Sequence, residues 1–304
     1  MISSATSFAI GSAIGSGSLW IMTQHSRVTT FIGAGGKTTC LRSLTQEINS
    51  AGLQVVATTT TKVYPEEHMI AWRNINPPPQ QKGACFWYDK VQNESGKWIG
   101  PLVTTIDDAI AEDFLSFKCR SNQTEEQREK ACASSRTDLE LPDSDSDSNK
   151  RYWVIEGDGA RGRKIKCWES YEPQIPRYTE CAVLVLDYGL WGNVLQADQV
   201  HRPHQCRDLV GQVWKAESAW SYFLRSPVFA PQYGQMSWVI LFNSPGNENK
   251  DVIDPMISLD LLRELGFKWV EIQERSVAVE TRPRHLRLAA GDAKEGDLRW
   301  FDLW

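Results

Sequence analysis

Short, continuously apolar segments recur along the chain, and stretches with helical periodicity lie between them. The apolar segments are rich in β-branched and aromatic residues, which is typical of parallel strands buried on both faces. They cover residues 28–32, 53–58, 85–88, 152–155, 182–186 and 238–242, and residues 268–272 are a candidate for a last strand. Helical periodicity follows residue 37 as far as Ala51, and it recurs over residues 105–117, 209–224 and 257–265.

This alternation predicts an α/β fold of three layers, in which helices cover both faces of a mostly parallel sheet. We expect a single domain over residues 28–304, preceded by a lead-in segment over residues 1–27. Residues 120–150 are polar and acidic, and they lack the apolar groups that would offset the entropy of ordering them. We therefore predict a disordered insertion within the domain there.

The composition narrows the classes of partner. The chain has 304 residues, of which 41% are hydrophobic, and a formal net charge of −5. That balance gives no overall basic field to hold nucleic acid or an anionic membrane. No apolar run reaches the roughly 18 residues that a transmembrane helix needs. We expect small molecules or other proteins as partners, with no nucleic acid and no membrane.

The seven cysteines are scattered without a Cys-x-x-Cys pair, and their number is odd. This usage favours a reduced, cytoplasmic protein over one built on disulfides. Residues 1–24 contain no acidic residue, yet no Arg precedes Arg27 and no charged segment precedes the apolar patch at residues 19–22. We favour a loose terminus or a short helix there, while organellar targeting stays open.

A glycine-rich turn separates the first predicted strand from the first predicted helix and reads Gly33-Ala34-Gly35-Gly36-Lys37-Thr38-Thr39. Backbone N–H groups of such a turn can point at phosphate oxygens, and the helix N-terminus adds positive potential. Lys37 would reach the β- and γ-phosphates, Thr38 would ligate Mg²⁺, and Thr39 would contact the α-phosphate. Phe31 stands where the common pattern has its first Gly, so the loop is a compact variant. The alternative is a glycine turn with a surface lysine.

Carboxylates follow the strand predicted at residues 152–155. Glu156 and Asp158 come at its carboxyl end, which is the edge where ligands gather in open α/β sheets. An acid there can hold Mg²⁺ or orient an attacking water, and Glu156 is the first choice for this role. The alternative is a Gly-Asp-Gly turn with solvated acids.

A basic run follows the carboxylates. It contains Arg161, Arg163, Lys164 and Lys166, and it suits phosphate or an acidic substrate. A solvated face is an equally good explanation of a charge run, so only Arg161, the residue nearest the carboxylates, is taken as a catalytic candidate.

Two further groups are candidates for binding. Thr58-Thr59-Thr60-Thr61-Lys62 leaves the second predicted strand at the same sheet edge, so Thr61 and Lys62 would face the γ-phosphate, although threonine also simply favours strands. His201, His204 and Cys206 have ligand types that suit a soft divalent metal. Their spacing matches no standard closed site, so a loop with partly exposed histidines is the better default.

Together these residues resemble the YqeC-type accessory proteins of selenium-dependent molybdenum hydroxylases. The pieces that carry the resemblance are residues 31–39 (FIGAGGKTT), 58–62 (TTTTK), 156–162 (EGDGARG), 171–176 (YEPQIP) and 200–202 (VHR). The resemblance spans residues 28–245 apart from the insertion. It implies a P-loop NTPase-like, nucleotide-binding protein that acts in the maturation of a selenium or molybdenum cofactor.

The resemblance also implies roles for particular residues. Residues 33–39 would be the phosphate loop, while Glu156, Asp158 and Arg161 belong to a shared motif, as do His201 and Arg202. Many relatives carry an acid after Asn-Lys for recognition of guanine, whereas this chain reads Asn243-Ser244-Pro245-Gly246-Asn247. We therefore favour ATP over GTP as the nucleotide.

The leading hypothesis is a nucleoside triphosphatase that uses Mg²⁺ with ATP or GTP, with a molybdenum hydroxylase, its cofactor or a cofactor-biosynthesis protein as client. Lys37, Glu156, Asp158 and Arg161 would be its catalytic residues, and Thr38 with Glu156 would hold the metal ion. One alternative is a small-molecule kinase in which Arg161, Arg163 and His201 bind the acceptor. Another is a nucleotide-gated binding module or metallochaperone that delivers an ion through the His201, His204 and Cys206 group.

Overall fold

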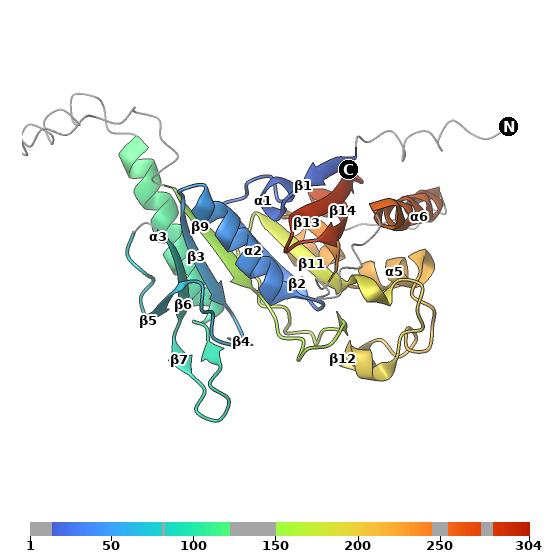
Figure 1. Cartoon of the computed structure of the whole chain (residues 1–304), viewed down its shortest axis with the longest axis horizontal. Helices are drawn as coiled ribbons and strands as arrows, with labels where there is room; N and C mark the ends of the chain where they lie inside the picture. The colour runs from blue at the N-terminus through green and yellow to red at the C-terminus, as the bar shows by residue number, and fades with distance from the viewer. Residues whose placement is uncertain (1–13, 81–82, 122–149, 245–254, 275–281) are drawn as a thin grey trace, which may run out of the picture.

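A computed structural model describes residues 14–80, 83–121, 150–244, 255–274 and 282–304. Its centre is a ten-stranded sheet that runs through the whole molecule (Figure 1). In sheet order the strands are β1 (Gly15–Gly17), β15 (Asp297–Asp302), β14 (His285–Asp292), β13 (Ser237–Asn243), β11 (Cys181–Asp187), β2 (Val28–Gly33), β9 (Arg151–Glu156), β3 (Gln54–Thr59), β6 (Ala84–Tyr88) and β5 (Ile70–Arg73).

The sheet is mostly parallel. All neighbouring strands from β14 to β5 pair in parallel, and only β15 runs antiparallel, to β14 on one side and β1 on the other. The central strand β2 lies between β11 and β9, so the carboxyl ends of these three strands meet at one edge. The sheet and its helices confirm the predicted α/β class.

Helices cover both faces of the sheet. Alternate residues of β2 show this, because Phe31 packs in the cluster that contains the side chains of α2 (Lys37–Ser50), while Ile32 packs in the cluster on the opposite face. The short helix α1 (Leu19–Met22) lies on the α2 side. The opposite face is covered by α3 (Val103–Ser121), α5 (Ala216–Phe223) and α6 (Pro255–Glu274).

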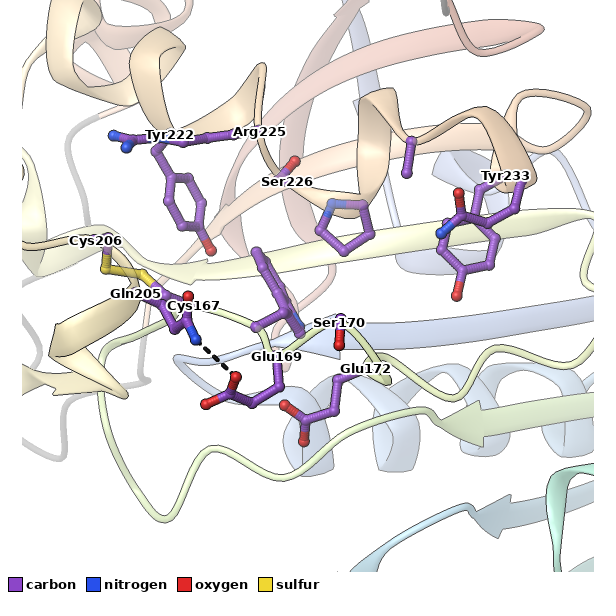
Figure 2. A pocket seen from close by; sticks show the side chains of 14 residues that line it. Cys167, Glu169, Ser170, Glu172, Gln205, Cys206, Tyr222, Arg225, Ser226 and Tyr233 are labelled. Carbon is purple, nitrogen blue, oxygen red and sulfur yellow. Dashed lines mark hydrogen bonds between the residues drawn. A yellow bond between two sulfur atoms is a disulfide. The ribbon is translucent and has the colours of Figure 1, made fainter.

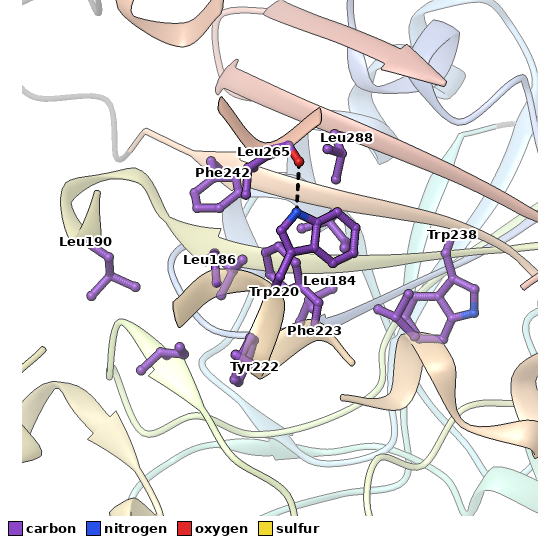
Figure 3. Close-up of a cluster of buried hydrophobic side chains, with 14 of the residues drawn as sticks. Leu184, Leu186, Leu190, Trp220, Tyr222, Phe223, Trp238, Phe242, Leu265 and Leu288 are labelled. Atoms are coloured by element: carbon purple, nitrogen blue, oxygen red, sulfur yellow. Dashed lines mark hydrogen bonds between the residues drawn. The ribbon is translucent and has the colours of Figure 1, made fainter. Parts of the chain in front are cut away.

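The core between the sheet, α5 and α6 is rich in tryptophan, and Figure 3 shows its central part. Trp220 of α5 is 1% exposed, stacks on Trp269 of α6 with ring centroids 4.6 Å apart, and donates from Nε1 to the carbonyl of Leu265 at 2.9 Å. Trp214 and Trp238 are fully buried in the same cluster. We call these four tryptophans and the apolar residues packed on them the tryptophan core.

Most predicted elements are confirmed. The strands predicted from residue 28 to residue 242 correspond to β2, β3, β6, β9, β11 and β13, and the predicted helix at residues 105–117 lies within α3. Residues for which no strand was predicted form a small antiparallel sheet of β4 (Lys62–Val63), β8 (Trp98–Ile99) and β7 (Lys90–Val91). The last two strands, β14 and β15, were not predicted.

Two predictions about the C-terminal half are wrong. Residues 268–272 are not a strand but belong to the last turns of α6. Leu261, Leu265 and Trp269 are buried at helical spacing, so the buried face of the helix continues through this segment. The segment was misassigned because five residues are too few for periodicity to distinguish a helix from a strand. The predicted helix at residues 209–224 forms only from Ala216, since the residues before it make turns in which the Leu195 N–H donates to the Gln212 carbonyl.

The lead-in segment contributes to the fold from residue 15 onward. Leu19 and Met22 are buried against α2, and the carboxylate of Glu47 accepts from the N–H groups of Leu19 (3.3 Å) and Trp20 (2.8 Å). Residues 1–13, and residues 122–149 of the predicted insertion, lie outside the described residues. Within the described ranges, none of the helices combines the length and apolar character that crossing a bilayer would require.

Candidate functional site

The glycine-rich loop leaves the carboxyl end of β2 and turns directly into α2. Gly33, Gly35 and Gly36 all have positive φ, at 93°, 79° and 107°. A side chain at Gly33 would overlap the Val185 carbonyl, and one at Gly35 would overlap the backbone of Asp187, so the loop packs tightly on the end of β11. These two positions require glycine for both their conformation and their space.

Lys37, the first residue of α2, folds back over this loop. Its Nζ donates to the carbonyl of Gly33 at 2.6 Å and lies 3.3 Å from Oδ1 of Asp158. Both side chains are almost completely buried, with 5% and 1% exposed. The ammonium group is therefore held at the mouth of the loop by an oxygen of the loop itself and by a carboxylate.

Asp158 holds the loop from the other side. Both of its carboxylate oxygens accept from the N–H of Gly33, at 3.1 and 3.2 Å. Oδ2 also accepts from Nε1 of Trp168 at 2.8 Å and lies 3.4 Å from Nζ of Lys166. Together with Lys37, these groups surround Asp158, which is therefore a fixed counter-charge that shapes the loop.

Glu156, at the end of β9, contacts Thr38, the loop residue that follows Lys37. Its Oε2 accepts a hydrogen bond from the hydroxyl of Thr38 at 2.9 Å. Burial raises the pKa of the Glu156 carboxyl, against the opposing effects of Lys37 and of the Thr38 hydrogen bond. A hydroxyl and a carboxylate at this separation are oxygen donors of the kind that Mg²⁺ prefers.

The threonine run holds strands together. Thr58 donates its hydroxyl to the carbonyl of Trp87, and Thr59 donates to the carbonyl of Glu156 at 3.0 Å. Thr61 lies at the site edge, because a side chain at Gly159 would come within 3.1 Å of its hydroxyl oxygen. Lys62 is exposed and begins β4. Thr58 and Thr59 therefore have structural roles, and the hydroxyl of Thr61 lies near Gly159.

The basic run divides into exposed and buried members. Arg161 is exposed and has a left-handed backbone, with φ 52°, while Arg163 is exposed and bonds to the carbonyl of Asp198. Lys166 is fully buried, so its interpretation as part of a solvated face is wrong. Its Nζ donates to the carbonyl of Gly159 at 2.8 Å and to Glu172 at 3.1 Å.

Lys166 connects the loop to a more distant part of the chain. It lies in β10 (Ile165–Lys166), which pairs in parallel with β12 (Val200–His201). Glu172 contacts Lys166 through one carboxylate oxygen and Arg202 through the other. Charges thus alternate from the loop outward, and we call this set the charge network: Lys37, Asp158, Lys166, Glu172 and Arg202.

Sequence reasoning named Glu172 and Arg202 only as parts of shared motifs and gave Trp168 no role. The charge network depends on the pairing of β10 with β12, and no local sequence pattern reveals that pairing. Residues 164–167 alternate between basic and apolar side chains, a strand-like pattern that would place Lys166 on the polar face, so the local sequence gives no sign of its burial.

The proposed metal group at His201, His204 and Cys206 is not supported. Cys206 is bonded to Cys167 in a disulfide, so its sulfur is no thiolate ligand, and the expectation that the cysteines are all reduced is wrong for this pair. His204 faces Glu169, with Nε2 3.1 Å from Oε1. Among the described residues, no three of His, Cys, Asp and Glu are arranged to hold a metal ion.

His201 lies in a cationic environment. Partial burial lowers its pKa from 6.5 to about 4, and the positive charges of Lys166, Arg202 and Arg161 act in the same direction. Its imidazole is therefore neutral at physiological pH.

Asn243 fixes the loop on the side away from the carboxylates. Its Nδ2 donates to the carbonyl of Gly35 at 3.2 Å, and its Oδ1 accepts from the N–H of Ala293 at 3.1 Å. The buried amide thus connects the loop to the turn between β14 and β15. The residues after Ser244, on which the expected preference for ATP depends, lie outside the described part of the chain.

Comparison with known proteins is consistent with the motifs. The family model described as "YqeC protein" matches residues 29–204. A curated relative, "Uncharacterized protein YqeC" from Escherichia coli (strain K12), is 26% identical over 188 residues. The match covers 62% of this chain and 62% of the relative. No solved structure matches. The family match covers more than half of the sequence, and the chain therefore belongs to the YqeC protein family.

Proposed function

We propose that this protein binds a nucleoside triphosphate with Mg²⁺ at the loop of residues 33–39 and hydrolyses it, on a fold of the P-loop NTPase type. The observation that carries the proposal is the convergence of Lys37, Thr38, Glu156 and Asp158 at the carboxyl ends of β2 and β9. Loop N–H groups, one ammonium group, one hydroxyl and one carboxylate are the groups that a magnesium-bound triphosphate requires.

The contacts of Lys37 support this assignment. Its ammonium group bonds to the Gly33 carbonyl and to Asp158, and phosphate oxygens can replace both partners. A buried lysine beside three positive-φ glycines would be costly for a turn that served only to connect two elements. In the bound state Lys37 would stabilise the charge on the transferring phosphoryl group.

Glu156 fits the metal and water roles better than Asp158. Asp158 is saturated by the Gly33 N–H, Trp168, Lys166 and Lys37, so it positions the loop. Among the described residues, the Glu156 carboxylate accepts one hydrogen bond, from the hydroxyl of Thr38. When bound, Mg²⁺ would neutralise phosphate charge at this point, held by Thr38 and by Glu156 directly or through water.

ATP is favoured over GTP, because no acid follows Asn243 at the position expected for guanine recognition. The client is proposed to be a molybdenum hydroxylase, its selenium or molybdenum cofactor, or a protein that makes that cofactor. This last step rests on the family resemblance alone. A small-molecule kinase is less well supported, since Arg163, one of its acceptor residues, is already bonded to the Asp198 carbonyl.

Phosphate release tests the proposal. We expect wild type to release phosphate from Mg·ATP, Lys37→Ala to lose that activity, and the isosteric Glu156→Gln to reduce the rate while still binding nucleotide. Lys90→Ala is the matched control, because Lys90 is an exposed lysine whose closest charged partner is its neighbour Asp89. Equal rates in wild type and Lys37→Ala, with either ATP or GTP, would contradict the proposal.

A further inference from the structure

A cavity of about 340 Å³ adjoins the charge network, because Glu172 is one of the residues that line it. Its walls come from the segment around residues 167–172, from residues 205–206 and from residues 222–233 (Figure 2). This volume is at the lower end of the range typical of sites for small molecules. The cavity can admit a small molecule but no folded protein.

The walls are held by specific contacts. Tyr222 donates its hydroxyl to the carbonyl of Lys166 at 2.7 Å, and Tyr233 donates to the carbonyl of Pro173 at 3.0 Å. Gln205 donates to Glu169 at 2.6 Å, a bond that Figure 2 shows across the lower side of the cavity. Because these groups are fixed by the protein itself, the cavity is preformed.

The Cys167–Cys206 disulfide forms one end of this cavity (Figure 2). Cys167 directly follows β10, and Cys206 follows the 3₁₀ turn Pro203–Gln205. The two cysteines are only 5% and 3% exposed, yet both line the cavity. The cavity is therefore a route by which a reagent from solution can reach the sulfur atoms.

We propose that the Cys167–Cys206 disulfide is a site of thiol–disulfide exchange with low-molecular-weight thiols that enter this cavity. The thiolate of the small molecule attacks one sulfur atom, the bond between the two cysteines breaks, and a mixed disulfide forms. The other cysteine leaves as a thiolate and takes up the proton that the small thiol lost, so no further oxidant or reductant is needed.

The site is distinct from the phosphate loop, although Trp168, which lines the cavity, also donates a hydrogen bond to Asp158. Access through a cavity of this size predicts selectivity by size, because a small thiol can approach the buried bond while a protein thiol cannot. A structural disulfide without such an opening would react only when the chain unfolds.

The test uses the full chain under native conditions with 2-mercaptoethanol as the probe. Samples are quenched with acid and alkylating agent, and mass spectrometry of peptides measures the mixed disulfide on Cys167 or Cys206. Ser170→Trp and Gln232→Trp each place an indole at an exposed position that lines the cavity, and Ser170→Ala is the matched control. Circular dichroism checks that each variant is folded.

We expect each Trp variant to slow the opening of the disulfide by about tenfold or more, because attack requires the approach of a thiolate to the sulfur. Ser170→Ala should react as wild type does, and reduced thioredoxin should open the bond only in the urea-unfolded chain. The proposal is overturned if both folded Trp variants react at the wild-type rate, or if thioredoxin opens the native disulfide readily. Recovery of both cysteines as free thiols from the air-oxidised protein would overturn it too.

Discussion

The inner charges of the network (Lys37, Asp158 and Lys166) and the tryptophan core are both buried, but they stabilise the fold in different ways. Each charge in the network depends on its neighbours, because an ion that loses its partner inside a protein keeps the cost of desolvation. In the tryptophan core each side chain contributes mainly through the apolar area that it buries. Damage to the network should therefore spread to the phosphate loop, whereas damage to the core should stay local.

The largest expected effect comes from removing the centre of the network. Asp158→Ala leaves Lys37 and Lys166 without a shared counter-charge, and we expect a loss of about 3–5 kcal/mol in the free energy of unfolding. Nucleotide binding should be lost as well, because the Gly33 N–H loses the acceptor that orients it. Urea denaturation and calorimetric titration measure the two effects.

Asp208→Ala is the control for this variant. Asp208 also pairs with a cation, Arg225, but its side chain is 59% exposed, so its loss should cost about 0–1 kcal/mol. Equal losses of stability in Asp158→Ala and Asp208→Ala would show that a buried ion pair of the charge network contributes no more to stability than an exposed one.

The second prediction concerns the tryptophan core. Trp220→Phe removes the hydrogen bond to the Leu265 carbonyl and part of the stacked area on Trp269. We expect a loss of about 1–2 kcal/mol in stability. Affinity for nucleotide, measured in the folded variant, should not change. A large loss of affinity would mean that the core and the loop are coupled more strongly than their contacts indicate.

The smallest expected effect is a pH dependence that arises at His201, beside the charge network. The folded-state pKa of His201 is lowered to about 4, so the folded chain binds fewer protons than the unfolded chain between pH 6.5 and pH 4. The stability that depends on neutral His201 is therefore present above this window and decreases as the pH falls through it. His201→Gln should lack this component.

Urea midpoints at pH 7.5 and pH 4.5 compare the two proteins. Wild type should lose more stability than His201→Gln between these two pH values. Identical losses would exclude a neutral, cation-surrounded His201.

The sequence was informative where the chemistry is local. Gly33 to Thr39 are consecutive, and Glu156 and Asp158 follow a recognisable strand, so topology alone predicted that they would meet. Six of the buried strands were also predicted correctly, because a strand inside a parallel sheet has an unbroken apolar pattern.

The missed features depend on contacts between distant residues. Lys166 belongs to a charge run, and only the pairing of β10 with β12 places it in the interior. Cys167 and Cys206 are 39 residues apart without a motif that indicates pairing. Residues 268–272 resemble a strand locally, while their helical character depends on packing against the sheet and α5.

The central claim is that the loop of residues 33–39 holds a nucleoside triphosphate, and isothermal titration of the native chain with Mg·ATP tests it most directly. Wild type and Lys90→Ala should bind with the same affinity, and Lys37→Ala should bind at least about tenfold more weakly, because a charge-assisted contact to phosphate is lost. The account is contradicted if wild type binds neither Mg·ATP nor Mg·GTP, or if Lys37→Ala binds as tightly as wild type.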